Sequence, residues 1–212
     1  MRKKKYSFQI FVYKELATIF RILLRIFYKF EIKGIENIPK EGPAIIAPNH
    51  RSSLDVIVIA SAIPRPIKAL GKIERFKYPI FGRFARYLGG IPVDREHPDK
   101  STIKTALEIL KNGNLLLIFP EGTRIGSHKK IESAKRGVAY FASKTNAPII
   151  PTAIVGADKI WPPERRIPKM RGKIKVVFGE PMYYSYGRSK IEEEEFTRRL
   201  METINTLLVM EK

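Results

Sequence analysis

Short apolar runs that alternate with helical patterns constrain the fold of this chain more than any other feature of its sequence. Five runs rich in Ile, Leu, Val and Ala are typical of buried strands: AIIAP, GIPV, LLLIFP, APIIPTAIVG and KIKVVFGEP. Helical periodicity predicts four helices between or after them, over Leu54 to Ala62, Asp99 to Lys111, Ser133 to Thr145 and Ser189 to Met210. Strands separated by helices predict an α/β fold with a mixed, partly parallel sheet flanked by helices, and 212 residues suffice for one such domain.

Residues 7–30 are predicted to form one long helix, because they contain neither Gly nor Pro. On a helical wheel the basic side chains of this helix fall in one narrow sector, which consists of Lys14, Arg21, Arg25 and Lys29. A basic stripe beside a broad apolar face is typical of a helix that lies in a membrane interface, although such a face also suits a helix packed on a protein core. We expect residues 1–33 to form a membrane-association helix with its basic sector toward the lipid headgroups, and residues 34–212 to form the α/β domain.

The chain carries 40 Lys and Arg against 21 Asp and Glu, a formal net charge of +19 at pH 7. A charge of this size indicates an anionic partner, for which nucleic acid, an anionic lipid surface and phosphorylated substrates are the candidates. The absence of cysteine excludes disulfides, thiolate zinc sites and a cysteine nucleophile. The three histidines, His50, His97 and His128, are not spaced like metal ligands, so we expect no metal site.

The sequence NHRSSLD follows the first predicted strand and contains a His–Asp pair. A neutral imidazole can accept a proton at physiological pH, and an aspartate on its other nitrogen fixes the tautomer and stabilises the imidazolium. Residues five apart lie roughly 140° apart on a helix, so His50 and Asp55 can meet only if His50 lies in the loop and Asp55 in the first helical turn. Because the chain has no G-x-S-x-G motif and no cysteine, His50 would act as a general base on a substrate hydroxyl. The alternative is that His50 only caps the helix.

Two further loops after predicted strands end in arginine, GGIPVDR at Arg95 and FPEGTR at Arg124. Arginine holds phosphate through two parallel hydrogen bonds, and glycine lets main-chain N–H groups approach the anion. Gly122 and Thr123 stand directly before Arg124 in a loop of this kind. Surface ion pairs with the neighbouring acidic residues are the alternative interpretation, but two arginines after two separate strands favour a phosphate site.

Four stretches of the sequence resemble, in order and approximate spacing, the four motifs of the glycerolipid acyltransferases: NHRSSLD, GGIPVDR, FPEGTR and PIIPTAIVG. The chain is similar to bacterial 1-acyl-sn-glycerol-3-phosphate acyltransferases over about residues 34–182. The resemblance implies that His50 is the general base and that Asp55 orients it. It also implies that residues of the second, third and fourth motifs bind substrate, together with a lysine in LGKIERF, which stands before the second motif. These residues are Lys72, Arg95, Glu121, Gly122, Thr123, Arg124 and Pro151. Ile125 stands where the family pattern has a serine after the arginine, so no hydroxyl contributes there.

The resemblance also implies the reaction. A fatty acyl group passes directly from acyl-CoA or acyl-acyl carrier protein to the sn-2 hydroxyl of lysophosphatidic acid, which gives phosphatidic acid without a cofactor, while main-chain N–H groups or Lys72 steady the oxyanion. The expected partners are these substrates and an anionic membrane surface, with the protein peripheral or monotopic at the cytoplasmic face of the cell membrane. Nucleic acid is not expected, because the basic residues form no recognisable nucleic-acid motif. The alternatives are another lysolipid acceptor, a basic nucleic-acid-binding protein and a non-catalytic membrane-binding module.

Overall fold

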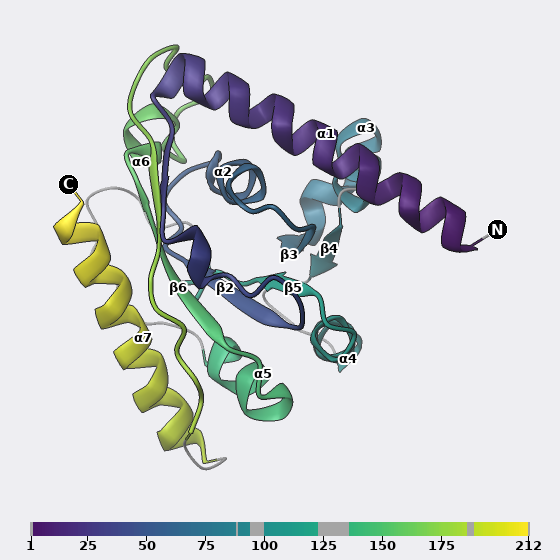
Figure 1. The fold of residues 1–212 in the computed structure, drawn as a ribbon, viewed down its shortest axis with the longest axis vertical. Helices are drawn as coiled ribbons and strands as arrows, with labels where there is room; N and C mark the ends of the chain where they lie inside the picture. Colours follow the sequence, from purple (N-terminus) through teal and green to yellow (C-terminus); the bar gives the residue numbers. More distant parts are fainter. Residues whose placement is uncertain (1, 88, 94–99, 123–135, 186–188, 212) are drawn as a thin grey trace.

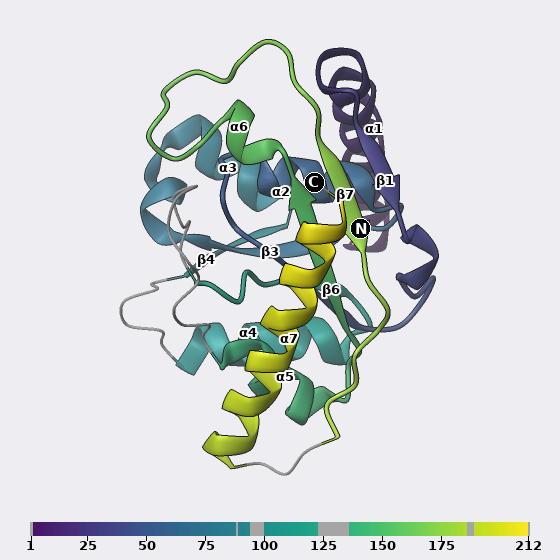
Figure 2. The same ribbon diagram turned by 90° about the vertical axis from the view of Figure 1, so that its left-hand side faces the viewer.

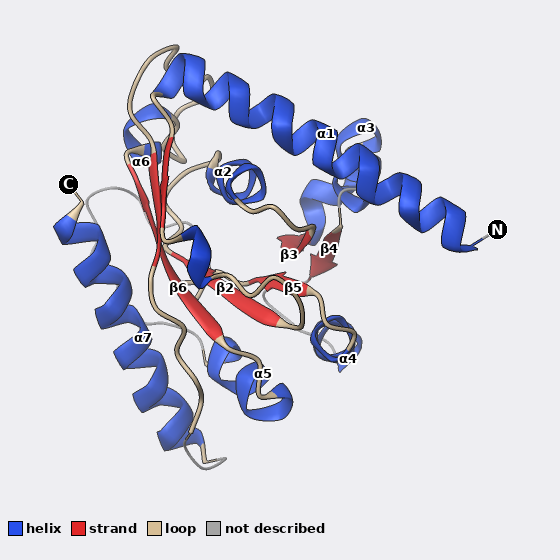
Figure 3. Cartoon of the chain, in the orientation of Figure 1, coloured by secondary structure: helices blue, strands red, loops and turns tan. Residues whose placement is uncertain are grey.

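The computed structural model describes residues 2–87, 89–93, 100–122, 136–185 and 189–211. Within them, a sheet of seven strands forms the centre of the molecule (Figures 1 and 3). The strands are β1 Glu31–Lys33, β2 Ala44–Pro48, β3 Ile67–Lys72, β4 Gly90–Val93, β5 Leu115–Leu117, β6 Ile149–Val155 and β7 Lys175–Phe178. Their order across the sheet is β1-β7-β6-β2-β5-β3-β4, so β2 is the central strand.

Neighbouring strands of this sheet pair in parallel except β6 and β7, which are antiparallel. The predicted class, an α/β fold with a mixed and partly parallel sheet, is therefore confirmed. Because β2, β5, β3 and β4 run in the same direction, their carboxyl ends lie along one edge, where open α/β sheets bind their ligands. The loops that follow β2 and β5, which carry His50 and Glu121, start at this edge.

Helices cover both faces of the sheet. They are α1 Arg2–Tyr28, α2 Asp55–Ala62, α3 Pro79–Tyr87, α4 Lys100–Lys111, α5 Gly137–Thr145, α6 Ala157–Ile160 and α7 Lys190–Met210, with short 3-10 helices η1 Ile35–Asn37 and η2 Ile73–Lys77. α1 and α2 cover one face, and α4, α5 and α7 cover the other (Figure 1). Since successive strand residues point to opposite faces, Ile46 of β2 packs toward the first layer and Ile45 toward the second, and both are fully buried.

Helix α1 packs on the domain along one side and exposes apolar side chains along another. The α1 side chains Tyr13 and Leu24 are buried in the hydrophobic core. On the same helix, Arg21 Nε donates a 2.6 Å hydrogen bond to the carbonyl oxygen of Ser61 in α2. The exposed apolar side chains are Phe8, Phe11, Ile19, Ile22, Leu23, Ile26 and Phe27. The expectation that the whole basic sector faces lipid headgroups is wrong for Arg21, because this residue borders the packed side. No helix in the part of the chain that the structure describes is long and apolar enough to cross a bilayer.

The structure contains elements that the sequence patterns do not predict. The strands β1 and β3 and the helices α3 and α6 lie outside the predicted set. The predicted strands correspond to β2, β4, β5, β6 and β7, and the predicted helices to α1, α2, α4, α5 and α7, with shifted ends. At the start of α7, the amide of Glu192 donates to Ser189 Oγ and the amide of Ser189 donates to Glu192 Oε2, a reciprocal cap that fixes where this helix begins.

Candidate active site

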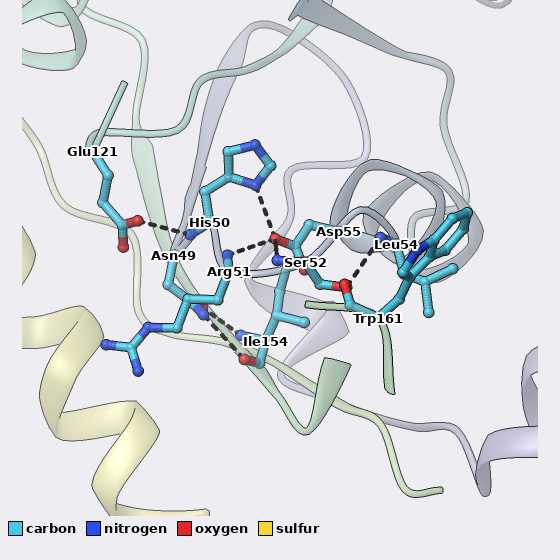
Figure 4. Close-up of polar contacts among 9 residues, drawn as sticks. All are labelled: Asn49, His50, Arg51, Ser52, Leu54, Asp55, Glu121, Ile154 and Trp161. Carbon is cyan, nitrogen blue, oxygen red and sulfur yellow. Dashed lines mark hydrogen bonds and ion pairs between the residues drawn. The ribbon is translucent and has the colours of Figure 1, made fainter. Parts of the chain in front are cut away.

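The His–Asp motif occupies the turn between the central strand β2 and helix α2 (Figure 4). β2 ends at Pro48 and α2 begins at Asp55, which places His50 in the loop and Asp55 in the first helical turn. This is the arrangement that the five-residue spacing requires for the two side chains to meet. The turn lies at the carboxyl edge of the sheet, beside the ends of β5 and β6, which flank β2.

His50 and Asp55 form a short, buried contact. His50 Nδ1 lies 2.8 Å from Asp55 Oδ2, and the two residues are 7% and 1% exposed. The same oxygen accepts the main-chain N–H groups of Arg51 and Ser52, each at 2.8 Å. Two main-chain donors thus fix the carboxylate group of Asp55. A carboxylate can only accept a hydrogen bond, so this contact suits the tautomer with Nδ1 protonated and Nε2 as the basic nitrogen.

The ring of Phe119 makes a second contact with the imidazole of His50. Phe119 follows β5, and its ring stacks on the imidazole with 3.8 Å between centroids and 20° between planes. Phe119 is itself buried, so it shields one face of the imidazole from water. Asp55 therefore fixes the imidazole at its Nδ1 edge, while Phe119 fixes it from one face.

Glu121 reaches the main chain of the histidine. The amide of His50 donates to Glu121 Oε2 at 3.2 Å, and the glutamate is 5% exposed. Burial raises the pKa of Glu121 to about 7, although the His50 hydrogen bond and the charge of Arg51 oppose that shift. The second oxygen, Oε1, is buried and has no hydrogen-bond partner among the described residues. The structure thus joins Glu121, which the sequence assigns to the substrate site, to the turn that carries His50 and Asp55.

Two further contacts hold the loop around His50. The side chain of Asn49 pairs with the main chain of Ile154 in β6, accepting from its N–H at 2.7 Å and donating to its carbonyl at 3.1 Å. On the other side, the carbonyl oxygen of Trp161 accepts the Ser52 hydroxyl at 2.8 Å and the amide of Ser53 at 3.1 Å. The turn is therefore fixed on both sides of the histidine by segments about 100 residues further along the chain.

The remaining predicted residues have different surroundings. Gly122 adopts a left-handed φ of 71°, and its amide closes a turn onto the carbonyl of Phe119 at 3.0 Å. Pro151 is buried in β6, whereas Lys72 is exposed at the end of β3 with its Nζ 3.7 Å from Glu74 Oε1. Three predicted residues lie outside the described residues: Arg95, Thr123 and Arg124. In the described ranges, no group of three or more His, Cys, Asp or Glu side chains could hold a metal ion.

The family model named Acyltransferase matches residues 29–155, a span that includes β2, the His50 turn, Glu121 and Pro151. A 1-acyl-sn-glycerol-3-phosphate acyltransferase of Bacillus subtilis (strain 168) is 32% identical over 173 residues, which are 81% of this chain and 83% of that protein. This chain belongs to the 1-acyl-sn-glycerol-3-phosphate acyltransferase family. Its members are acyltransferases of phospholipid biosynthesis.

Two further relatives of this acyltransferase extend the comparison. The crystal structure of the 1-acyl-sn-glycerophosphate (LPA) acyltransferase PlsC from Thermotoga maritima superposes with a TM-score of 0.80 and 27% identity, covering 100% of this chain and 84% of that one. The chloroplastic 1-acyl-sn-glycerol-3-phosphate acyltransferase LPAT1 of Arabidopsis thaliana is 32% identical over 177 residues. That alignment covers 79% of this chain and 49% of the plant protein, so the chain spans about half of this relative.

Sequence reasoning misses three residues that shape the acyltransferase site. Asn49 and Phe119 stand inside the quoted motifs, and their positions beside His50 and before Glu121 are signals that could have been used. Trp161 acts through its main-chain carbonyl and lies 109 residues from Ser52, so no local pattern indicates it.

Proposed function

We propose that this chain transfers a fatty acyl group from an acyl thioester to the sn-2 hydroxyl of lysophosphatidic acid, which yields phosphatidic acid. His50 is the general base of the transfer, and Asp55 orients it. The observation that carries this proposal is the 2.8 Å contact between His50 Nδ1 and Asp55 Oδ2 in a buried turn at the carboxyl edge of the sheet. General acid–base catalysis of this kind contributes about 10²–10⁴-fold to a rate.

Each of the two steps of the acyl transfer is accompanied by a proton transfer at His50. Nε2 of His50 takes the proton of the sn-2 hydroxyl as the oxygen attacks the thioester carbonyl, which forms a tetrahedral oxyanion. The imidazolium is stabilised by the ionised Asp55, whose Oδ2 already accepts three hydrogens in the resting site. When the C–S bond breaks, the proton on Nε2 passes to the leaving thiolate, so the enzyme returns to its starting state.

The phosphate of the acceptor is assigned to Arg95 and Arg124. Support comes from the strands that precede them, because β4 and β5 run parallel to β2 and end at the same edge as the His50 turn. Gly122 supports a close approach of the anion, because its left-handed backbone carries no Cβ. Thr123 completes this phosphate loop.

The oxyanion is assigned to main-chain N–H groups of the loops at this edge, or to Lys72 at the end of β3. Lys72 is half-exposed, with 45% of its side chain accessible, so its ammonium can turn toward a bound thioester or phosphate. Pro151 and Glu121 shape the wall of the site beside β2, through the strand β6 and through the His50 amide. No cofactor enters this scheme, and the donor is acyl-CoA or acyl-acyl carrier protein as a co-substrate.

We assign the protein to the cytoplasmic face of the cell membrane, and the surface of α1 supports an attachment to a bilayer. Its outward apolar side chains and the exposed Lys14, Arg25 and Lys29 suit an anionic bilayer surface, and its inward side is fixed to the domain by Tyr13 and Leu24. Residues 1–33 thus act as a membrane-association helix attached to the acyltransferase domain of residues 34–212. We propose no nucleic-acid partner, because the exposed basic side chains of α1 lie beside a large apolar face, which suits a bilayer surface.

The experiment that tests this function is an acylation assay on the purified protein. Phosphatidic acid should form from lysophosphatidic acid with either thioester donor, and a panel of lysophospholipids and lyso-ornithine lipid should react more slowly. Faster acylation of another lysolipid would reassign the acceptor, and the absence of product from every acceptor would refute the acyltransferase assignment.

A further inference from the structure

We propose that the loop of residues 161–173, which joins α6 to β7, is a second membrane-contact element that binds anionic lipid headgroups beside the C-terminal end of α1. The inference rests on the proposed membrane attachment of α1 and goes beyond it. It assigns a partner to a segment that lies outside all four acyltransferase motifs. It also links the bilayer surface to the turn that carries His50.

The loop presents apolar side chains to solvent between basic ones. Ile167 is 70% exposed and Met170 is 67% exposed, so two large apolar side chains three residues apart face solvent. The segment from Ala157 to Lys173 has two acidic residues, Asp158 and Glu164. Its basic residues are Lys159, Arg165, Arg166, Lys169, Arg171 and Lys173. Alternating apolar and basic side chains are the combination that an anionic interface binds.

The loop is adjacent to α1 in space. Tyr28, the last residue of α1, donates its hydroxyl to the carbonyl of Lys169 at 3.0 Å, and its own carbonyl accepts the amide of Ile174 at 2.9 Å. Figures 1 and 2 both show the loop after α6 at the same end of the molecule as the C-terminal end of α1. The exposed Ile26 of α1 and the exposed Ile167 and Met170 therefore belong to one end of the protein.

Internal hydrogen bonds give the loop a defined shape. The indole Nε1 of Trp161 donates to the carbonyl of Arg165 at 2.9 Å, and the amide of Lys169 donates to the carbonyl of Ile160 at 3.0 Å. Arg165 Nε donates to the carbonyl of Ile167 at 2.7 Å. A loop held in this way presents Ile167 outward as part of its structure, so burial in a bilayer costs little further ordering.

The same loop begins at the residue that supports the catalytic turn. The Trp161 carbonyl accepts the hydroxyl of Ser52, and Figure 4 draws both of these residues. It also accepts the amide of Ser53, which like Ser52 lies between His50 and Asp55. Contact between residues 161–173 and the bilayer would therefore position the His50 turn relative to the lipid surface. A lysolipid acceptor that stays in the bilayer then meets the base without leaving the membrane.

An acidic carrier protein is the other partner that a basic loop could attract. The bilayer is favoured because the loop combines its charges with Ile167 and Met170, and because it continues the apolar side of α1. A bilayer surface accounts for both features of the loop, its basic charges and its exposed apolar side chains.

The experiment is co-sedimentation of the full chain with vesicles of phosphatidylcholine and phosphatidylglycerol. The double variant Ile167→Glu, Met170→Glu should lower the partition coefficient about tenfold or more, because two buried apolar contacts are replaced by charges that anionic lipid repels. Ile191→Glu is the matched control, since Ile191 is 78% exposed at the start of α7, and it should bind like the wild type. Circular dichroism melts should show that all of these proteins are folded.

Different outcomes separate this inference from the function on which it rests. Wild-type binding that is lost in Ile26→Glu but unchanged in the loop variant would overturn the inference and leave the attachment through α1 intact. Wild-type protein that does not sediment with the vesicles would overturn both. Unchanged vesicle binding together with a raised KM for acyl-acyl carrier protein in the loop variant would assign the loop to the carrier protein instead, and would equally overturn the membrane proposal.

Discussion

The side chain of Asn49 takes over the sheet pairing of Ile154 at the point where β2 ends. β2 pairs with β6 as far as Pro48 and Thr152, and two residues further along β6 the Asn49 amide group replaces the main chain, with hydrogen bonds of 2.7 and 3.1 Å to Ile154. The residue directly before His50 is thereby fixed to the sheet. This explains how a loop can hold His50 in one position without being part of a strand.

Replacing Asn49 by alanine should loosen the turn and lower stability. The change leaves the buried N–H and carbonyl of Ile154 without partners, at a cost of about 1–3 kcal/mol for each group. We expect the Asn49→Ala protein to show a lower free energy of unfolding in urea and a reduced kcat. Asn205→Ala, on the exposed side of α7, is the control and should lower neither value, because alanine has the higher helix propensity. Wild-type stability in Asn49→Ala would contradict the pairing.

Glu121 should make stability depend on pH. Its pKa is raised to about 7 by burial, whereas a glutamate in the unfolded chain titrates near 4.5, so the folded state holds the proton more tightly. The stabilising contribution of the protonated group is complete below pH 4.5 and is lost as the pH rises to about 7. Glu121→Gln cannot ionise, and its amide oxygen can still accept the His50 amide.

We therefore expect the melting temperature of the wild type to fall more between pH 5 and pH 8 than that of Glu121→Gln. Both proteins share every other titrating group, so the difference between their two profiles isolates Glu121. Parallel profiles would show that the carboxyl group is ionised throughout this range, against the effect of its burial.

Arginine-to-lysine changes test the phosphate site. Arg95→Lys and Arg124→Lys keep the charge but lose the paired hydrogen bonds, so the apparent KM for lysophosphatidic acid should rise while the KM for the thioester donor changes less. Arg198→Lys on the exposed side of α7 serves as the control. A rise confined to the donor KM would show that these arginines bind the phosphates of coenzyme A.

Variants on the two sides of α1 should separate membrane binding from stability. Ile22→Ser with Ile26→Ser changes side chains that are 51% and 68% exposed, so vesicle binding should be lost with little effect on unfolding. Leu24→Ala, at a residue that is 4% exposed, should cost about 2–5 kcal/mol of stability and keep vesicle binding. Vesicle binding that survives in the Ile22→Ser, Ile26→Ser protein would contradict the role of α1 in membrane binding.

The sequence predicts the central strands and misses the edges, for a physical reason. β2 and β5 are buried on both faces and read as continuous apolar runs, AIIAP and LLL. β1 has three residues with only its middle one shielded, and β3 carries Lys68 and Gly71, so neither shows this pattern. The helix α3 begins at Pro79 and contains Gly82, residues that local propensity assigns to turns.

Of the contacts in the candidate site, the sequence likewise predicts some and misses others. The spacing of His50 and Asp55 predicts their contact, because only a loop-and-helix arrangement lets them meet. The contacts of Glu121 with the His50 amide, and of Trp161 with Ser52, join residues 71 and 109 positions apart. Such contacts depend on the order of the strands in the sheet, which one sequence does not reveal.

The central claim is that His50 removes the proton of the acceptor hydroxyl, and the rate of phosphatidic acid formation by His50→Ala measures it most directly. Under saturating lysophosphatidic acid and acyl-CoA, we expect this rate to fall by about 10²–10⁴-fold or more, while circular dichroism shows a folded protein. Asp55→Asn should fall in the same assay, because the imidazole loses the partner that sets its tautomer. A His50→Ala protein that forms phosphatidic acid at close to the wild-type rate would contradict the account.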